Sequence, residues 1–240
     1  MTYPSTYPRI LPNGEAAFTV EFGDAVDAEL NRRVHALDAS LQQHPLPGVV
    51  ECVPTYRSLL VRHDLLAAEG DLVLAALWER VVQLFATAPP PETRGETIAS
   101  GSGRLIEIPV YYGGEFGRDL PDVAAHCGLE PEEVIRLHTQ PLYQVAMLGF
   151  APGFAYLLNL PESLATPRLA TPRLRVQAGS VGIAGNQTGV YALSTPGGWR
   201  IIGRTDLRLF DPARCAPFLV RAGDQIRFIA AQPDEHVTGS

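Results

Sequence analysis

The sequence predicts an α+β fold, with a small ferredoxin-like α/β domain at residues 1–92 followed by a mostly β domain at residues 100–240. The composition changes at "ATAPPPETRGETIASGSGR", residues 86–104, where three prolines and a Gly/Ser stretch form a connector that no periodic pattern crosses. Before the connector, strand-like and helix-like patterns follow in the order β-α-β-β-α. After Pro141, short apolar runs alternate with Gly/Pro turns at the spacing of a closed β-barrel or a sandwich.

The first domain is expected to hold three strands and two helices. Phe18, Val20 and Phe22 alternate on one face of a strand over residues 16–22. A helix is predicted over residues 24–44, two short β-type runs divided by Pro54 over residues 49–64, and a second helix over residues 70–88. The helix positions expected to face the core are Val26, Leu30, Val34, Leu37 and Leu41 in the first helix and Leu72, Val73, Leu77, Val81 and Leu84 in the second.

The second domain is expected to begin with a strand, "RLIEIPVYY", followed by two short helices within residues 119–140. The second of these helices begins at Pro131, with Glu132 and Glu133 in the first turn, where the helix dipole favours acidic side chains. No convincing helix follows Pro141. The apolar runs expected to be strands are "YQVAMLGF", "GVYAL", "WRIIG", "LRLF" and "QIRFIA".

Charge and composition exclude several classes of protein. The 19 basic and 26 acidic residues give a net charge of −7, and no basic run is present, so we do not expect a nucleic-acid partner. No apolar run approaches the ~20 residues of a membrane span, and the first residues lack the pattern of a signal peptide. The three cysteines, Cys52, Cys127 and Cys215, are far apart and not at metal-ligand spacing. We therefore expect a cytoplasmic protein without a membrane segment or a metal site.

A glycine-rich stretch, "AGSVGIAGNQTGVYALSTPGGWRIIGRT", runs from Ala178 to Thr205. It lacks the lysine and the spacing of a Walker A loop, and its glycines do not match the dinucleotide fingerprint. Two interpretations remain open. The glycines either turn the corners of a barrel, or expose backbone amides that bind an anion. The candidate binding residues in this stretch are Ser180, Gly182, Gly185, Gln187 and Thr188.

A second group of candidate residues lies upstream. His138 is in the last turn of a predicted helix, where it either transfers protons or serves as a satisfied structural group. Tyr143 follows five residues later. In "GFAPGFAYL", Phe150 and Phe154 flank a turn at Pro152, and these aromatic residues form either a pocket wall or part of the core.

Three arginines are candidates for clamping a carboxylate or a phosphate. Arg168 and Arg173 are spaced by five residues in "TPRLATPRLRV", and Arg204 follows in "IIGRT". A guanidinium beside exposed amides binds such anions well. The alternative is that these side chains only solvate a face of the protein.

Four motifs in this order resemble the KipI / allophanate hydrolase subunit 1 family: "GFAPGFAYL", "TPR…TPRLRV", "AGSVGIAGNQTGVY" and "STPGGWRIIGRTDLRLFDP". The segments "RILPNGEAAFTVEFG" and "PGVVECVPTYRSLLV" extend the resemblance to most of the chain. The sequence departs from the family at Ala192 and Gln177, where the family usually has proline. Both are turn positions, so the departures concern local rigidity.

The resemblance implies a cyclophilin-like β-barrel for the second domain. It also implies an ATP-dependent conversion of 5-oxoproline to glutamate, carried out with a carboxyltransferase-like C subunit and a LamB/YcsF-like A subunit. This chain would be inactive alone, and any ATP site would be atypical or shared with a partner, because no nucleotide motif is visible.

For that reaction, the expected catalytic residues are His138, for proton transfer, and Arg173. Arg168 or Arg173 would hold the carboxylate, and the Ser180–Gln187 region would contact an oxyanion. The resemblance leaves two other functions open: a biotin-dependent carboxyltransferase half acting on urea or a related amide, and a non-catalytic inhibitor of a histidine kinase.

Overall fold

The computed structural model describes residues 6–85 and 103–232. The chain divides into two compact units, residues 1–101 and 102–240. The two predicted domain limits, 92 and 100, and all of the predicted connector except Gly103 and Arg104 lie within residues 86–102, outside the described residues. Among the described residues, no helix combines the length and the apolar character needed to cross a membrane.

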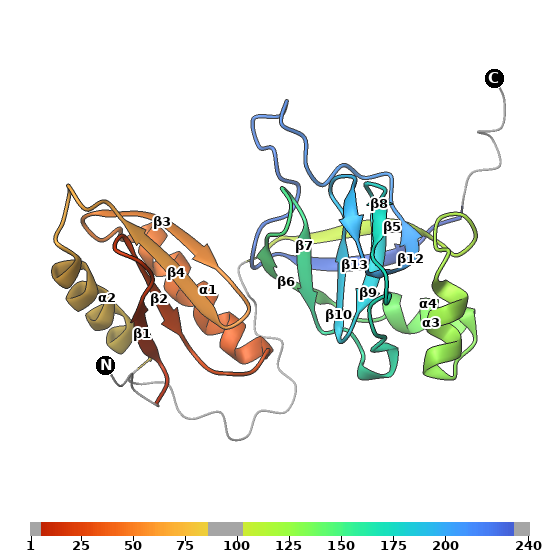
Figure 1. Cartoon of the computed structure of the whole chain (residues 1–240), viewed down its shortest axis with the longest axis horizontal. Coiled ribbons are helices and arrows are strands. Elements are labelled where there is room, and N and C mark those ends of the chain that lie inside the picture. Colours follow the sequence, from red (N-terminus) through yellow and green to blue (C-terminus); the bar gives the residue numbers. More distant parts are fainter. Residues whose placement is uncertain (1–5, 86–102, 233–240) are drawn as a thin grey trace. The chain divides into compact units, whose positions relative to one another are not determined.

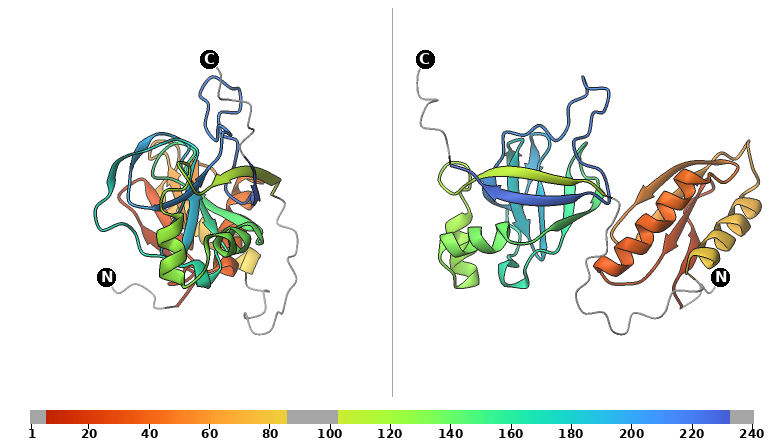
Figure 2. Two further views of the ribbon diagram at one scale, coloured as in Figure 1. Left: turned by 90° about the vertical axis from the view of Figure 1, so that its right-hand side faces the viewer. Right: turned by 180° about the vertical axis from the view of Figure 1, so that it is seen from behind.

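The first unit is an antiparallel sheet with two helices (Figures 1 and 2). Figure 2 (right) shows both helices against one face of the sheet. The strand order is β1-β2-β4-β3. The elements are β1 (Arg9–Pro12), β2 (Ala17–Glu21), α1 (Ala28–Gln43), β3 (Val49–Pro54), β4 (Ser58–His63) and α2 (Gly70–Phe85). The predicted β-α-β-β-α series is present, preceded by the additional strand β1. The assignment to the ferredoxin-like class stays a prediction.

The core of this unit corrects two predicted positions. The Asp27 side chain accepts hydrogen bonds from the backbone N–H groups of Glu29 and Leu30 and so starts α1. Val26 therefore lies before the helix and is exposed. In α2, Leu72 was expected to face inward, but it is 65% exposed. The buried helix residues are Asn31, Val34, Leu37, Asp38 and Leu41 in α1 and Val73, Leu77 and Val81 in α2.

The second unit is a closed β-barrel of seven strands in the order β10-β7-β6-β13-β5-β12-β9, with β9 also paired to β10 (Figure 1). The barrel strands are β5 (Leu105–Tyr112), β6 (Tyr143–Leu148), β7 (Ala155–Leu158), β9 (Ser180–Ala184), β10 (Gln187–Val190), β12 (Arg200–Arg204) and β13 (Gln225–Ala230). β5 and β13 are parallel, and the other pairs are antiparallel. The closed barrel is consistent with the cyclophilin-like barrel that the resemblance implied.

Two helices and a short two-stranded sheet accompany the barrel. α3 (Leu120–Cys127) contacts β12, and α4 (Pro131–Thr139) contacts β13. These are the two short helices predicted from the sequence. β8 (Arg173–Val176) pairs with β11 (Thr195–Gly197) outside the barrel sheet.

The region after Pro141 contains one turn of 3-10 helix, η1 (Glu162–Leu164). The predicted strand "LRLF" is wrong. Residues 206–209 have no strand pairing, and only Phe210 forms an isolated bridge, to Phe218.

Apolar side chains from every barrel strand fill the interior. Burying each large aliphatic or aromatic side chain contributes roughly 1.5–3 kcal/mol, so the barrel is a rigid support for groups on its rim. Fully buried examples from different strands are Ile108, Val145, Leu157, Ile183, Ile202 and Phe228.

Candidate functional site

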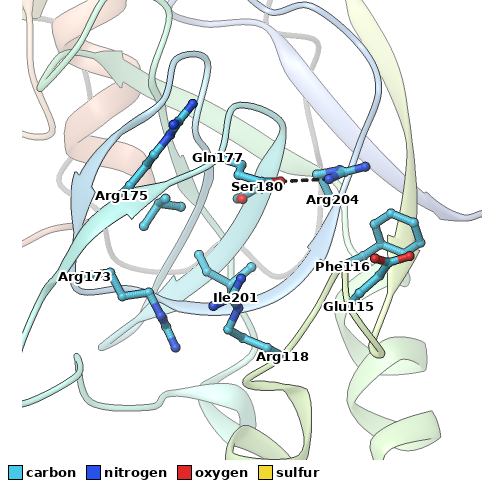
Figure 3. Close-up of a pocket in the computed structure, with 10 residues that line it drawn as sticks. Glu115, Phe116, Arg118, Arg173, Arg175, Gln177, Ser180, Ile201 and Arg204 are labelled. Atoms are coloured by element: carbon cyan, nitrogen blue, oxygen red, sulfur yellow. Dashed lines mark hydrogen bonds between the residues drawn. The ribbon is translucent and has the colours of Figure 1, made fainter.

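A cavity of about 110 Å³ lies in the barrel unit, beside the start of β9. Its lining comes from three parts of the chain: the turn between β5 and α3, strand β8 with the turn after it, and the adjacent strands β9 and β12. In Figure 3, Ser180 lies between Arg175 and Arg204. Four of the lining residues are arginines, namely Arg118, Arg173, Arg175 and Arg204. We call this site the arginine cavity.

Arg173 is fixed by a buried carboxylate. Its two terminal nitrogens donate to both oxygens of Asp119, at 2.9 and 2.6 Å. The Asp119 Oδ2 atom also accepts the backbone N–H of Ile201 at 2.6 Å. Asp119 thus ties the start of α3 to β8 and β12, and it neutralises the charge of Arg173. The predicted clamp residue therefore forms part of the cavity wall with its charge already paired.

Arg204 is held by one ring and one amide. Its guanidinium carbon lies 4.7 Å from the centroid of the Phe116 ring, a cation–π contact. Its Nη1 atom donates to Oε1 of Gln177 at 2.9 Å, the dashed line in Figure 3. Neither contact neutralises the charge, so Arg204 is oriented but remains electrically uncompensated.

Gly179 sets the distance between the turn before β9 and the end of β12. Its φ is +83°, and a Cβ atom built there would collide with the carbonyl oxygen of Thr205. Its N–H donates to Tyr191 O at 2.7 Å, and its carbonyl accepts from Thr205 N at 2.9 Å. Because only glycine allows this approach, the residue brings Gln177 and Ser180 beside Arg204.

Three further polar groups of the lining are available to a ligand. Within the described residues, the side chains of Arg118 and Arg175 form no ion pair or hydrogen bond, and both are exposed. Ser180 is only 5% exposed, and its hydroxyl group has no partner within the same residues. A hydroxyl without a protein partner and two unpaired guanidiniums beside one cavity are suited to binding an anion.

The structure does not bring His138 to this cavity. The side chain is fully buried, and burial lowers its pKa to about 3, so the ring is neutral. Its Nε2 atom lies 2.9 Å from Thr188 Oγ1, and the Thr188 hydroxyl donates to Gly182 O at 3.0 Å. The hydroxyl must therefore accept from Nε2–H, which leaves Nδ1 to accept from Tyr112 O–H at 2.8 Å.

This network gathers four of the predicted site residues into one buried group, away from the arginine cavity. Tyr143 donates its hydroxyl to His138 O at 2.8 Å, so it belongs to the same buried group as His138, Thr188 and Gly182. The His138 ring also stacks on Phe228 inside the barrel. With both ring nitrogens in use and no exposed surface, His138 is placed as a structural group rather than as a proton donor to a substrate.

The aromatic candidates separate into core and surface. Phe154 is buried and packs edge to face with Tyr156, Tyr191 and Trp199. Phe150 is 63% exposed and adopts φ +66°. Neither residue lines the arginine cavity.

Four remaining candidates also lie outside this cavity. Pro152 and Arg168 are exposed. Burial raises the pKa of Tyr156, and the nearby charge of Arg168 partly opposes that shift. Gly185 (φ +60°) occupies the first position of the two-residue turn between β9 and β10, where glycine is preferred. Gln187 begins β10 directly after this turn. For Gly185, the corner-turning interpretation is therefore the one that the structure supports.

Of the predicted site residues, the arginine cavity gathers Arg173, Ser180 and Arg204. Sequence reasoning missed Arg118 and Arg175. Arg175 lies two residues after Arg173, a spacing that puts both side chains on one face of a strand, so this signal was present. For Arg118 there was none, because only the folding of α3 onto the barrel brings it near β8.

Comparisons with known proteins agree over most of the chain. The family model described as carboxyltransferase domain, subdomain C and D, matches residues 8–220. The chain is 44% identical over 229 residues to the B subunit of 5-oxoprolinase from Bacillus subtilis (strain 168), covering 93% of each sequence. It is 46% identical over 219 residues to the B subunit of 5-oxoprolinase from Escherichia coli O157:H7, covering 90% of this chain and 93% of that protein.

Among solved structures, the chain resembles TTHA0988 with a TM-score of 0.75 and 39% identity. That match covers 91% of this chain, but this chain spans only 40% of the length of TTHA0988. Since one family model covers most of the sequence and two relatives exceed 40% identity over nearly their full length, the chain belongs to the carboxyltransferase-domain (subdomain C and D) family, the KipI / allophanate hydrolase subunit 1 type that its motifs resemble.

Proposed function

We propose that this chain is the B subunit of a multi-subunit 5-oxoprolinase, which hydrolyses the cyclic amide 5-oxoproline to glutamate. One observation carries the proposal: two proteins named as the B subunit of 5-oxoprolinase are 44% and 46% identical to this chain over at least 90% of each sequence. Because the matches span nearly the whole length, both units of this chain have counterparts in those relatives.

The arginine cavity is the place in the barrel unit where an acidic ligand would bind. Arg118 and Arg175 would contact the anion, and the Ser180 hydroxyl would donate to it. Arg173 would shape the wall, since Asp119 already neutralises it, and Arg204, which Phe116 orients, would add its charge to the binding of the anion. Arginine forks bind carboxylates and phosphates with two parallel hydrogen bonds.

The complex would use ATP, with further subunits completing the ATP site. A cavity of about 110 Å³ is well below the roughly 300–1,000 Å³ of sites that enclose a whole small molecule. It fits one anionic group rather than a nucleotide. The partners would be a carboxyltransferase-like C subunit and a LamB/YcsF-like A subunit. The longer chain of TTHA0988, of which the matched region is 40%, supports a role joined to further polypeptide.

A second candidate is half of a biotin-dependent carboxyltransferase acting on urea or a related amide. The description of the matching family model, a carboxyltransferase domain, favours it. The arginine cavity would also accommodate the ureido oxygen of carboxybiotin. The first candidate is preferred because the relatives named as the B subunit of 5-oxoprolinase match over at least 90% of the chain.

Reconstitution tests the proposal. The chain is mixed with candidate A and C subunits, and the release of ADP that depends on 5-oxoproline is measured. We expect no turnover from the chain alone and turnover from the complete mixture, with the Bacillus subtilis relative as the positive control. Turnover with the control but not with this chain, or carboxylation of urea when a biotin carboxylase is supplied, would contradict the proposal.

Substitutions in the same assay test the site. Arg175→Gln is expected to reduce turnover about tenfold, the effect of one lost charge-assisted hydrogen bond. The matched control is Arg136→Gln, an exposed arginine on α4 that pairs with Glu133 away from the cavity. Equal activity of both variants would exclude the arginine cavity as the ligand site without excluding the proposed reaction.

A further inference from the structure

We infer that the arginine cavity selects a dianionic phosphoryl group over a monoanionic carboxylate. This inference deepens the proposed function and rests on it for the assignment of the cavity as the ligand site. The ligand class follows from the charge balance of the lining, from its free donors and from its size.

The charges around the cavity do not balance among themselves. Asp119 neutralises Arg173, and the lining carries one further carboxylate, Glu115, which forms no ion pair among the described residues but adds one negative charge. Two positive charges therefore remain from Arg118, Arg175 and Arg204, and arginine stays protonated at any relevant pH. A dianion compensates this excess completely, whereas one carboxylate leaves one guanidinium unmatched.

The neutral groups on the lining are also arranged as donors. Ser180 as a residue is 5% exposed and lines the cavity, and its hydroxyl has no partner among the described residues. Gln177 Oε1 accepts a hydrogen bond from Arg204, so the amide N–H groups of Gln177 remain available to a ligand. A phosphoryl group offers three strong acceptor oxygens, one more than a carboxylate, and so can satisfy these donors together with the unpaired guanidiniums.

The position of Arg204 adds a shape requirement. The ring of Phe116 and the Gln177 amide both contact the guanidinium and orient it. An oriented fork costs little conformational entropy on binding. At about 110 Å³, the cavity has room for one tetrahedral group. That group belongs either to a small phosphorylated molecule or to the end of a nucleotide whose remainder lies outside.

The affinities of small anions for the full chain, measured by isothermal titration calorimetry, distinguish the effect of ligand charge from that of ligand shape. Sulfate is a tetrahedral dianion, methanesulfonate a tetrahedral monoanion and acetate a planar monoanion. We expect sulfate to bind about tenfold more tightly than either monoanion, as expected for one additional unit of charge near the surface. Equal affinities for sulfate and methanesulfonate would overturn the inference.

The pH dependence supplies a second test. Methyl phosphate gains its second charge near pH 6, as phosphorylated side chains do, so with a roughly tenfold preference for the dianion its affinity should rise about fivefold between pH 5 and pH 8. Sulfate keeps both charges over this range and reports any titration of the groups around the cavity, which include Glu115, Asp119 and, at the next pair, Asp122 beside Arg200. If the affinities of methyl phosphate and sulfate change in parallel, the inference is wrong.

Variants locate the binding. Arg118→Gln and Arg175→Gln should each weaken sulfate binding about tenfold, and both are exposed and unpaired, so folding should be unaffected. Arg136→Gln is the matched control. Binding that survives both cavity substitutions would place the anion elsewhere and overturn the inference.

Two more arms identify the source of the phosphoryl group and keep this inference separate from the proposed function. ATP and ADP that bind more tightly than methyl phosphate indicate a nucleotide; the opposite order indicates a small phosphorylated molecule, and either supports the phosphoryl class. If the chain supports 5-oxoproline turnover but binds acetate as tightly as sulfate, the proposed function stands and this inference is wrong. If the chain binds sulfate more tightly than acetate but gives no turnover in the reconstituted mixture, only the proposed function is wrong.

Discussion

Asp119 joins the start of α3 to two strands, so Asp119→Asn removes a support of the arginine cavity without changing the size of the side chain. The carboxylate is 5% exposed and its partner Arg173 is 23% exposed. Removing one partner of a buried ion pair costs roughly 3–5 kcal/mol. Because Arg173 still reaches solvent, we reduce this to about 2–3 kcal/mol of the free energy of unfolding.

Urea unfolding of the barrel unit measures this loss. The chain has two tryptophans, Trp78 in the first unit and Trp199 in the second, so fluorescence in a Trp78→Phe background reports on the barrel alone. The control is Asp122→Asn, whose carboxylate is 64% exposed and makes one contact with Arg200 at 3.0 Å. A surface pair of this kind contributes at most about 1 kcal/mol. Equal losses in the two variants would refute the reasoning.

Three further perturbations test other parts of the structure. Burial lowers the pKa of His138 to about 3, so between pH 6.5 and pH 3 this histidine is protonated in the unfolded chain but not in the folded barrel. The barrel should therefore lose about 2 kcal/mol of its free energy of unfolding between pH 7 and pH 5. In urea titrations at each pH, His138→Gln should flatten this dependence. Gly179→Ala combines a positive φ with a backbone collision and should lower the free energy of unfolding by about 3 kcal/mol. Gly114→Ala, with φ +53° and open space around the added Cβ atom, should lower it by about 1 kcal/mol. Thermal unfolding compares the two variants, and equal losses would contradict the packing argument. Burial, with nearby carboxylates, raises the pKa of the Cys52 thiol to about 11, so iodoacetamide followed by peptide mass spectrometry should label the exposed Cys215 at least about tenfold faster; faster labelling of Cys52 would show that the first unit opens readily.

Local patterns predict the secondary structure because neighbours along the chain decide it. The alternation of Phe18 and Val20 corresponds to β2, and Pro131 marks the start of α4. The errors arise where tertiary packing decides. In α2, a stripe through Leu72 and one through Val73 both satisfy the helical period, and the sheet buries the second.

The arginine cavity is less visible in the sequence because its parts are distant along the chain. "TPRLRV" places Arg173 and Arg175 on one strand face, so that half of the site has a local signal. Arg118 has no local signal, because the ion pair between the next residue, Asp119, and Arg173 is what brings it to the cavity. His138 misleads for the opposite reason: its place at a helix end suggests exposure, but the barrel encloses it completely.

The composition of the arginine cavity bears on the division of labour in a multi-subunit enzyme. Apart from histidine, every basic residue of the chain is arginine, which does not exchange protons at neutral pH. Among the described lining residues, Glu115 is the only carboxylate, and His138 is sealed inside the barrel. The cavity is therefore equipped to hold and orient an anion but poorly equipped for general acid–base chemistry. If a cyclic amide binds at this cavity, most proton-transfer groups must come from outside its described lining, and a partner chain is one physical source of such groups.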